Sequence, residues 1–203
     1  MKLTLKNPDK DLLAEVGKKV KKGETCIYPT ETCYGLGTNA LDAKAVEKIY
    51  DIKRRSTKDK LSCVVSSLEQ AERYCNLNET EREICERFMP GPLTLVAEKK
   101  KNVPDILNED FVFRISSNEI ATKLAEEADV PIVATSANFS GADNNYSVKD
   151  ISRITRETVD IVLDVGTLEK NNPSTVIKVE DRDLKIFREG PVSREEIERF
   201  LSI

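Results

Sequence analysis

The apolar residues of this chain recur at helical spacing in some segments and in short runs typical of strands in others. Leu12, Leu13, Val16 and Val20 share one face of a helix predicted over 9–22, which Gly23 ends. The same spacing and capping residues predict helices over 42–53, from Ser67 onward, over 79–88 and 118–129, from Ser147 to about Arg156, and after a cap at Ser193 and Glu196. Apolar or alternating runs predict strands over 24–28, 61–66, 93–98, 111–115, 131–135, 159–164, 174–180 and 184–188.

Helices and strands mix along the whole chain, with no repeat, linker or low-complexity tract. This pattern predicts one α/β (α+β) domain over residues 1–203. The strands predicted over 159–188 have no helix between them, so we expect a mixed sheet with an antiparallel part. Residues 99–110 are the most loop-like stretch.

The amino-acid composition excludes several kinds of catalytic and metal site, although it says little about the fold. The 203 residues contain no histidine, which excludes Ser-His-Asp and Cys-His catalysis and a histidine-ligated metal site. The chain carries 32 basic and 36 acidic residues, a net charge of −4, which disfavours a surface devoted wholly to nucleic acid but allows a local basic site.

The five cysteines show neither a disulfide pattern nor a zinc pattern. Their spacing is irregular, no Cys-x-x-Cys pair occurs, and most lie in apolar runs, so we expect buried free thiols in a reducing compartment. The N-terminus has no apolar signal region, and no apolar run approaches the roughly 18 residues of a membrane span. We therefore expect a soluble, cytoplasmic protein that does not bind membranes.

The first polar motif is Tyr28-Pro-Thr-Glu-Thr-Cys-Tyr-Gly-Leu-Gly37, which is predicted to be a loop decorated with hydroxyls and one carboxylate. It contains Gly35-x-Gly37-x-x-Ala40, which matches a dinucleotide fingerprint. The preceding strand ends about six residues too early, and no acidic residue closes the next strand, so this match is weak.

The second motif is a cationic cluster, Lys53-Arg-Arg-Ser-Thr-Lys-Asp-Lys60. A solvated basic helix end explains such residues in part. Three consecutive cations also repel one another unless an anion is present, and the phosphates of a nucleotide would supply it. No phosphate-binding glycine loop of the P-loop type occurs, so side-chain cations would have to form a phosphate site.

Further polar residues follow or interrupt apolar strands. Thr135-Ser-Ala-Asn-x-Ser-Gly141 comes directly after a buried strand, where a capping turn and a ligand site are both open. Ser174 starts a strand and Arg188 ends the next. Arg114 interrupts an apolar strand, so we expect it to be buried against either a structural carboxylate or a ligand carboxylate.

Taken in order, these segments resemble the YrdC/TsaC family of threonylcarbamoyl-AMP synthases. The matching pieces span nearly the whole chain: 28–37, Lys53-x-Arg55, Pro90-Gly-Pro-Leu-Thr94, Phe113-Arg-Ile115, Ser136-Ala-Asn-x-Ser-Gly141, Ser174-Thr-Val176 and Arg188-x-Gly190. The resemblance implies a single YrdC-like domain in the short form of the family. Its fold would be a twisted mixed parallel/antiparallel sheet flanked by helices around a large, positively charged cavity.

The resemblance also implies a reaction. L-threonine, bicarbonate and ATP would give threonylcarbamoyl-AMP, pyrophosphate and water, with Mg²⁺ accompanying ATP. The product would serve threonylcarbamoylation of adenosine-37 in tRNA through a downstream transferase complex, with at most weak direct tRNA binding. A carbamate is already an anionic nucleophile, so this reaction needs alignment and cations rather than a histidine base.

The resemblance implies roles for individual residues. Catalysis would fall to Lys53 and Arg55, and no residue is implied as a metal ligand. ATP would contact Lys53, Arg55, Asp59, Ser136, Asn138, Ser147 and Arg188, and threonine would contact Thr32, Arg114, Ala134 and Ser174. The chain departs from the usual family pattern at Ser56, Asp59, Lys60, Val64, Asp110 and Pro173.

Two other functions stay open at this point. An RNA-binding module could use the cationic cluster as an electrostatic footprint, although the acidic balance and the few aromatic residues disfavour it. A carbamoyl-transfer domain acting on another acceptor is the third possibility, since similar domains occur in larger carbamoyltransferases.

Overall fold

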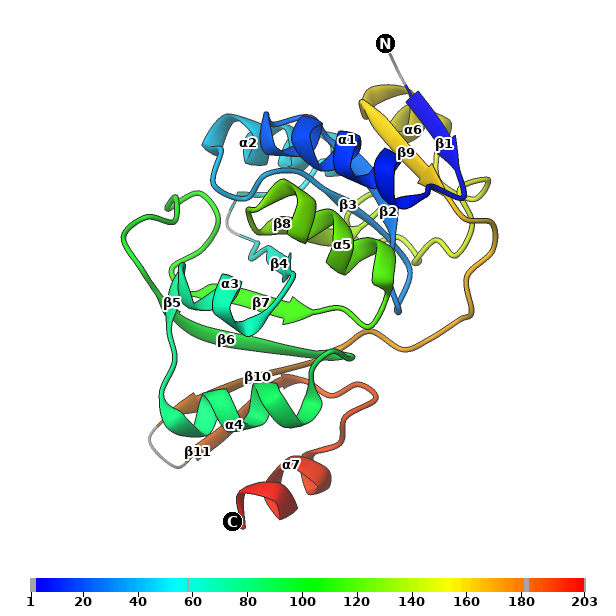
Figure 1. The fold of residues 1–203 in the computed structure, drawn as a ribbon. Helices are drawn as coiled ribbons and strands as arrows, with labels where there is room; N and C mark the ends of the chain where they lie inside the picture. The colour runs from blue at the N-terminus through cyan, green and yellow to red at the C-terminus, as the bar shows by residue number, and fades with distance from the viewer. Residues whose placement is uncertain (1–2, 58, 181–182, 203) are drawn as a thin grey trace.

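A mixed β-sheet with helices against its faces forms the centre of the molecule (Figure 1). The computed structural model describes residues 3–57, 59–180 and 183–202. The strands within these residues are β1 (Leu3–Lys6), β2 (Cys26–Pro29), β3 (Tyr34–Gly37), β4 (Ser62–Val65), β5 (Cys75–Asn76), β6 (Leu93–Lys99), β7 (Phe111–Ile115), β8 (Ile132–Ser136), β9 (Ile161–Asp164), β10 (Thr175–Glu180) and β11 (Asp183–Arg188).

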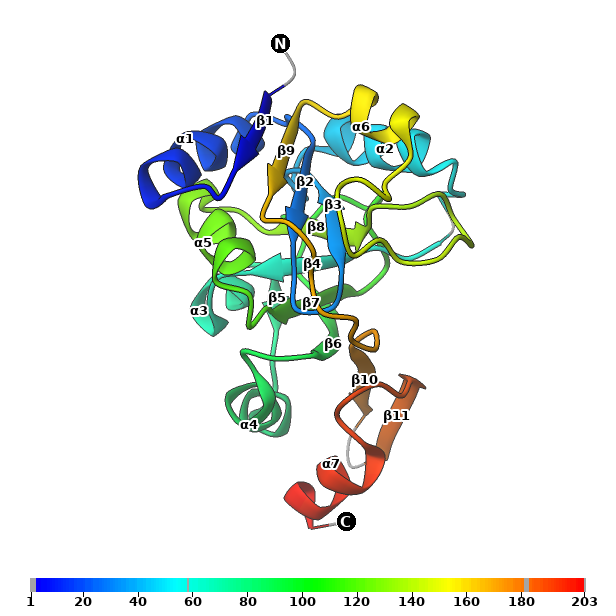
Figure 2. The same cartoon turned by 90° about the vertical axis from the view of Figure 1, so that its right-hand side faces the viewer.

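The strands connect in the order β1-β9-β2-β3-β8-β4-β7-β6-β10-β11, with β5 paired to β6. Four pairs are parallel, namely β1–β9, β9–β2, β4–β7 and β6–β10, and the other pairs are antiparallel. The predicted mixed α/β fold is therefore confirmed. The predicted antiparallel part is confirmed in the β10–β11 hairpin, which lies with α7 at the opposite end of the molecule from β1 (Figure 2).

The helices bury the apolar stripes that the sequence displays. They are α1 (Lys10–Lys21), α2 (Ala43–Lys53), α3 (Leu68–Glu72), α4 (Glu79–Phe88), α5 (Glu119–Ala128), α6 (Arg153–Thr158) and α7 (Arg194–Leu201). Leu13, Val16 and Val20 of α1 share a buried cluster with Leu124 of α5. Gly17 allows this close approach, because a Cβ there would lie 2.6 Å from the Cβ of Glu127. Among the described residues, no helix is long and apolar enough to cross a membrane.

The capping residues place the ends of two helices near the positions that the sequence predicts. Asp42 accepts hydrogen bonds from the first-turn amides of α2, and Ser193 with Glu196 forms the expected capping box of α7. All five cysteines are buried and free, as expected.

Two expectations about local structure are wrong. Ser147 caps no helix: α6 begins six residues later, and its cap is Ser152, whose hydroxyl accepts from the amide of Thr155. The motif 28–37 is not an extended loop but the β2–β3 hairpin with a short connection. Gly35 and Gly37 therefore lie inside a strand rather than in a turn before a helix, which removes the dinucleotide interpretation.

A glycine at position 37 is required by the close approach of β3 to β8. A Cβ at this position would lie 2.0 Å from the carbonyl oxygen of Val133. We expect Gly37→Ala to lower the free energy of unfolding by about 1–3 kcal/mol, because the overlap forces the two strands apart. Urea denaturation measures the change, with Glu47→Ala on the exposed face of α2 as the control. An alanine variant as stable as the wild type would contradict the close approach.

Candidate functional site

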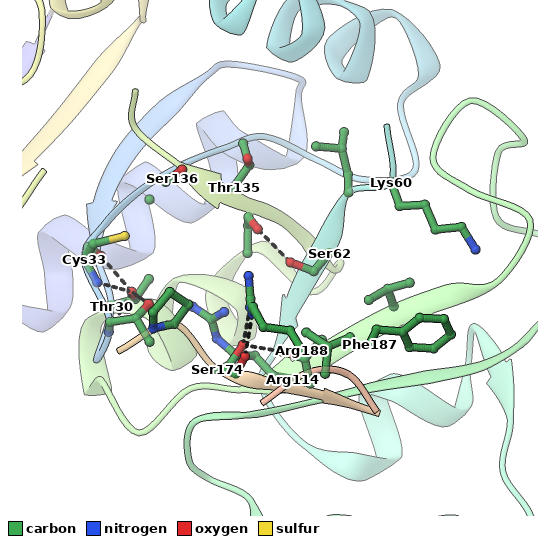
Figure 3. A pocket seen from close by; sticks show the side chains of 18 of the residues that line it. Thr30, Cys33, Lys60, Ser62, Arg114, Thr135, Ser136, Ser174, Phe187 and Arg188 are labelled. Carbon is green, nitrogen blue, oxygen red and sulfur yellow. Dashed lines mark hydrogen bonds between the residues drawn. The ribbon is translucent and has the colours of Figure 1, made fainter. Parts of the chain in front are cut away.

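A cavity of about 420 Å³ opens between the β2–β3 connection, the sheet and the segment that follows α2 (Figure 3). Among the described residues, its lining contains four cationic side chains, Arg55, Lys60, Arg114 and Arg188, and no carboxylate. The remaining lining residues are mostly hydroxyl-bearing, small or apolar: Thr30, Thr32, Cys33, Gly35, Leu61, Ser62, Thr94, Val96, Val112, Ala134, Thr135, Ser136, Asn144, Pro173, Ser174, Val176 and Phe187. Such a lining favours an anionic ligand that also has an apolar part.

The alternation of strand side chains explains how distant segments reach one cavity. In each strand, every second residue points to the same face of the sheet. The cavity face receives Ser62 of β4, Thr94 and Val96 of β6, Val112 and Arg114 of β7, Ala134 and Ser136 of β8, and Val176 of β10. In β4, β6 and β7 the residues between them, Cys63, Leu95 and Phe113, are buried in the main hydrophobic core. The end of β8 departs from this alternation, because Thr135 lines the cavity together with Ala134 and Ser136.

Arg114 is buried among apolar residues, where an unpaired charge would be unfavourable, and it has a carboxylate partner. Its Nε lies 3.0 Å from Oε1 of Glu31 in the β2–β3 connection. This contact is an ion pair without a hydrogen bond, and Nη1 and Nη2 likewise make no hydrogen bond to any residue in the described ranges, although Arg114 lines the cavity. The sequence left open whether Arg114 pairs with a carboxylate of the protein or of a ligand. The structure identifies Glu31 as a protein partner, and the terminal nitrogens of Arg114 stay available to a ligand.

Arg188 is fixed beside Arg114 without a carboxylate among the described residues. Its Nε donates to the carbonyl of Ser174 at 2.9 Å and its Nη2 donates to the hydroxyl of Ser174 at 3.2 Å. That hydroxyl also shares a hydrogen bond of 2.8 Å with Thr94. Burial and the positive charge of Arg114 lower the pKa of Arg188, so a nearby anion would favour its charged form.

Arg55 reaches the cavity from the segment that follows α2. Its Nη2 donates to the carbonyl of Lys60 at 2.8 Å, and its Nη1 donates to the hydroxyl of Thr135 at 3.4 Å. Its Nε lies 3.6 Å from a carboxylate oxygen of Asp59, which itself lies outside the lining. Lys60 forms an ion pair of 3.7 Å with Asp110. Lys58 of the cationic cluster lies outside the described residues.

Lys53 is not in the cavity lining but lies directly behind Ser136. It is only 2% exposed, and its Nζ donates to the carbonyls of Ser136 at 2.5 Å and Asn138 at 2.9 Å, and to Oδ1 of Asn138 at 3.0 Å. The hydroxyl of Ser136 donates to the same Oδ1 at 2.6 Å. Lys53 and Asn138 therefore hold the turn that presents Ser136.

The end of α2 explains why Lys53 and Arg55 diverge. Arg54 adopts a left-handed conformation (φ 52°, ψ 43°) that ends the helix. Lys53, the last helical residue, then faces inward, while Arg55 continues into the segment beside the cavity. The guanidinium of Arg54 lies over the ring of Phe139 at 4.9 Å. The cationic cluster is therefore not a continuous solvated strip.

The structure brings together seven of the eleven residues implied for substrate binding: Thr32, Arg55, Arg114, Ala134, Ser136, Ser174 and Arg188 line the cavity. Lys53, Asp59, Asn138 and Ser147 do not. Ser147 instead forms an isolated bridge with Thr167, and Asn144 of the same loop takes the place at the lining.

Several lining residues received no individual role from the sequence: Thr30, Lys60, Thr94 and Thr135 lie in motifs that the sequence analysis names, whereas Ser62, Asn144 and Phe187 lie outside them. A usable signal existed for some of them. Ser62 and Thr94 are hydroxyls at alternate positions of otherwise apolar strands, in the same way as Arg114. Asn144 and Phe187 carry no comparable signal, because a loop and an edge strand often expose such residues.

Comparison with known proteins identifies the same family by a sequence model and by individual relatives. The sequence model named Sua5/YciO/YrdC, which is described as "telomere recombination", matches residues 18–190. A Methanocaldococcus jannaschii protein provisionally named as a threonylcarbamoyl-AMP synthase is 37% identical, over 94% of this chain and 91% of its own length. The threonylcarbamoyl-AMP synthase of Pyrococcus abyssi is 35% identical over 90% of this chain, which spans 55% of that relative.

A solved structure shows the same fold. The crystal structure of Pyrococcus abyssi Sua5 complexed with L-threonine superposes with a TM-score of 0.90 and 31% identity, and covers 98% of this chain and 60% of the Pyrococcus chain.

The environment of Lys53 leads to a prediction about pH. Burial, followed by the positive charge of Arg55, lowers the pKa of Lys53 to about 8 from the ordinary 10.5. Between these values the folded state binds fewer protons than the unfolded chain, so the contribution of Lys53 to stability increases as pH rises through this window.

Two measurements check this pKa. In NMR of protein labelled at lysine, one side-chain resonance should titrate near pH 8 and be missing from Lys53→Met. The difference in unfolding free energy between wild type and Lys53→Met should also move in favour of the wild type from pH 8 to 10.5. Titration of every lysine at its ordinary pKa would contradict the prediction.

Proposed function

This chain belongs to the Sua5/YciO/YrdC family, and on that premise we propose that it is an L-threonylcarbamoyladenylate synthase, a nucleotidyltransferase that acts in tRNA modification. It would convert L-threonine, bicarbonate and ATP into threonylcarbamoyl-AMP, pyrophosphate and water. The observation that carries the proposal is one cavity whose described lining residues supply four cations and several hydroxyls, with no carboxylate among them. The relatives named above and the threonine in the Pyrococcus structure support the same substrates.

In this proposal threonine lies at the end of the cavity near Arg114. The free Nη1 and Nη2 of Arg114 would bind its carboxylate through two parallel hydrogen bonds. Thr32, Ser174 and the backbone at Ala134 would contact the rest of the amino acid, since all three residues line the same hollow. This assignment uses a buried guanidinium whose remaining nitrogens otherwise have no partner.

ATP would extend toward Arg55 and Arg188. Two guanidinium groups in one cavity suit a chain of phosphates, and Ser136 of the same lining supplies a hydroxyl. Lys53, Asn138 and Asp59 would act from behind the lining, through Ser136 and Arg55. Asn144 rather than Ser147 would contact the nucleotide, because it faces the cavity.

The chemistry then needs no histidine. The threonine amine combines with carbon dioxide from bicarbonate to give a carbamate, and a carbamate oxygen attacks the α-phosphorus of ATP. The bond from this phosphorus to the bridging oxygen breaks, and the electron pair leaves with pyrophosphate. Arg55 and Arg188 would hold the phosphates in line and stabilise the charge that develops on them.

Mg²⁺ would enter with ATP as part of the substrate. Among the described residues there is no group of three or more Asp, Glu, Cys or His side chains that could hold a metal ion, and the lining offers hydroxyls without a carboxylate. This lining is thus suited to bind phosphate oxygens rather than to coordinate Mg²⁺.

The wider setting is part of the same proposal. The product would pass to a tRNA threonylcarbamoyl-transferase complex that modifies adenosine-37. A cytoplasmic location suits the five free thiols. The buried position of Lys53 and the placement of Arg54 on Phe139 leave the cationic cluster less suited to direct RNA binding.

The complete reaction gives a direct test. We expect the purified protein to release pyrophosphate from ATP only when L-threonine and bicarbonate are both present. A coupled pyrophosphate assay, with each component left out in turn, measures this dependence. Release that ignores threonine, or none under any condition, would contradict the proposed function.

The two sides of the cavity should respond separately to substitution. We expect Arg55→Ala and Arg114→Ala each to reduce kcat/KM by about 10²–10³, the usual effect of losing one charged donor to the transition state. Arg114→Ala should raise KM for threonine, and Arg55→Ala should act mainly through ATP, because the two side chains lie on different walls.

Steady-state kinetics with each substrate varied in turn distinguishes these effects. Arg153→Ala, an exposed arginine on α6, is the matched control and should leave both constants unchanged. If Arg114→Ala changed only the constants for ATP, the placement of threonine would be wrong.

A further inference from the structure

Glu31 is a partly buried carboxylate that the proposed reaction does not use. It lies in the connection between β2 and β3, and its side chain is 12% exposed. It is absent from the cavity lining, so it does not meet the space where a ligand would lie. Its Oε1 instead lies 3.0 Å from Nε of Arg114.

The carboxylate of Glu31 is itself held in place by its surroundings. The hydroxyl of Ser116 donates to Oε2 of Glu31 and accepts from the amide of Asn118, which fixes its direction. On the backbone, the side-chain amide of Asn171 donates to the carbonyl of Glu31 at 3.0 Å. Ser116 therefore restrains the carboxylate of Glu31, and Asn171 restrains its backbone.

Glu31 acts on the guanidinium of Arg114 through charge, because Nε and Oε1 form an ion pair at 3.0 Å without a hydrogen bond between them. The attraction draws the Nε side of Arg114 toward Glu31, and neither Nη1 nor Nη2 makes a hydrogen bond to a described residue. Nη1 and Nη2 form the edge of the guanidinium that can bind both oxygens of a carboxylate. The orientation of that edge thus depends on the contact on the opposite side.

The charge of Glu31 also offsets a repulsion. Arg114 lies near Arg188, and its positive charge helps to lower the pKa of Arg188. Without a carboxylate behind it, Arg114 would be pushed away from Arg188 and from the cavity, and its own burial would be costly. Glu31 supplies the compensating charge from behind the wall, where it does not repel an anionic substrate.

We propose that Glu31 is a positioning residue for substrate selection, which orients Arg114 so that its two terminal nitrogens face the cavity and receive the carboxylate of the amino-acid substrate. This inference rests on the proposed role of Arg114 in the synthase reaction. It predicts that Glu31 acts on the amino acid and not on ATP, and that it acts only through Arg114.

The test is a double-mutant cycle on threonine kinetics. Glu31→Gln keeps the shape of the side chain and removes its charge. We expect it to raise KM for L-threonine by about tenfold, since a misaligned guanidinium loses bidentate contact, while KM for ATP changes less than about twofold. In the Arg114→Ala background the same substitution should change kcat/KM for threonine by less than about twofold.

Three further variants complete the design. Glu31→Asp keeps the charge and should recover part of the threonine affinity. Ser116→Ala removes the donor to Oε2 but leaves the ion pair, so it should raise KM for threonine in the same direction by a smaller factor. Glu119→Gln, an exposed carboxylate at the start of α5, is the control and should change neither constant. Thermal unfolding of each variant verifies that it is folded.

The outcomes separate this inference from the proposed function. If the wild type shows threonine-dependent pyrophosphate release and Glu31→Gln leaves KM for threonine unchanged, the role of Glu31 is wrong and the function stands. An equal effect of Glu31→Gln with and without Arg114 would also overturn it. If Glu31→Gln does not fold, an unchanged KM for threonine in Ser116→Ala overturns the inference. Absence of threonine-dependent release in the wild type would overturn the proposed function itself.

Discussion

Repulsion among the cations that share the cavity is the constraint on which the site depends. Like charges that lie close together in a partly desolvated space disfavour the folded state unless each one is balanced. Three of the four have a carboxylate partner outside the lining: Arg55 with Asp59, Lys60 with Asp110 and Arg114 with Glu31. Because these carboxylates lie outside the lining, they compensate the cations without filling the cavity with negative charge. An anionic ligand can then add to the balance instead of competing with an acidic side chain inside the site.

The sheet makes this arrangement possible because one of its faces packs into the hydrophobic core and the other lines the cavity. The alternation along β4, β6 and β7 sends Cys63, Leu95 and Phe113 into the hydrophobic core while Ser62, Thr94, Val96, Val112 and Arg114 face the cavity. Arg114 therefore sits one residue from a fully buried phenylalanine and still presents its guanidinium to the ligand space. A shift of register by one residue would exchange the two faces and place the arginine in the core. The rigid strands thus provide orientation that loops alone would not give.

The sequence predicts the elements well where one strong pattern governs them. The stripes of α1, α2 and α5 and the caps at Asp42 and Ser193 depend on contacts within a few residues, so local patterns identify them. Ser147 was a wrong cap because Ser152 competes for the same role, and only the tertiary course of the loop decides between them. β3 was missed because its two glycines read as a turn, whereas they permit close approach to β8. The burial of Arg114 could be predicted, but its partner lies 83 positions away in the chain at Glu31.

The inward turn of Lys53 shows why residue type and spacing do not by themselves assign a catalytic role. Lys53 and Arg55 are two residues apart and equally basic, and a linear motif gives both of them to phosphate. The left-handed Arg54 separates them, so that one becomes a buried donor to three oxygens behind Ser136 and the other lines the cavity. A lysine buried against neutral oxygens, with its pKa lowered to about 8, is more sensitive to local charge than an exposed one. Anionic phosphate close to Arg55 would offset the positive charge that helps to lower this pKa, and would thereby favour the protonated form that holds the turn. Occupation of the cavity and the rigidity of the Ser136 turn would then reinforce each other.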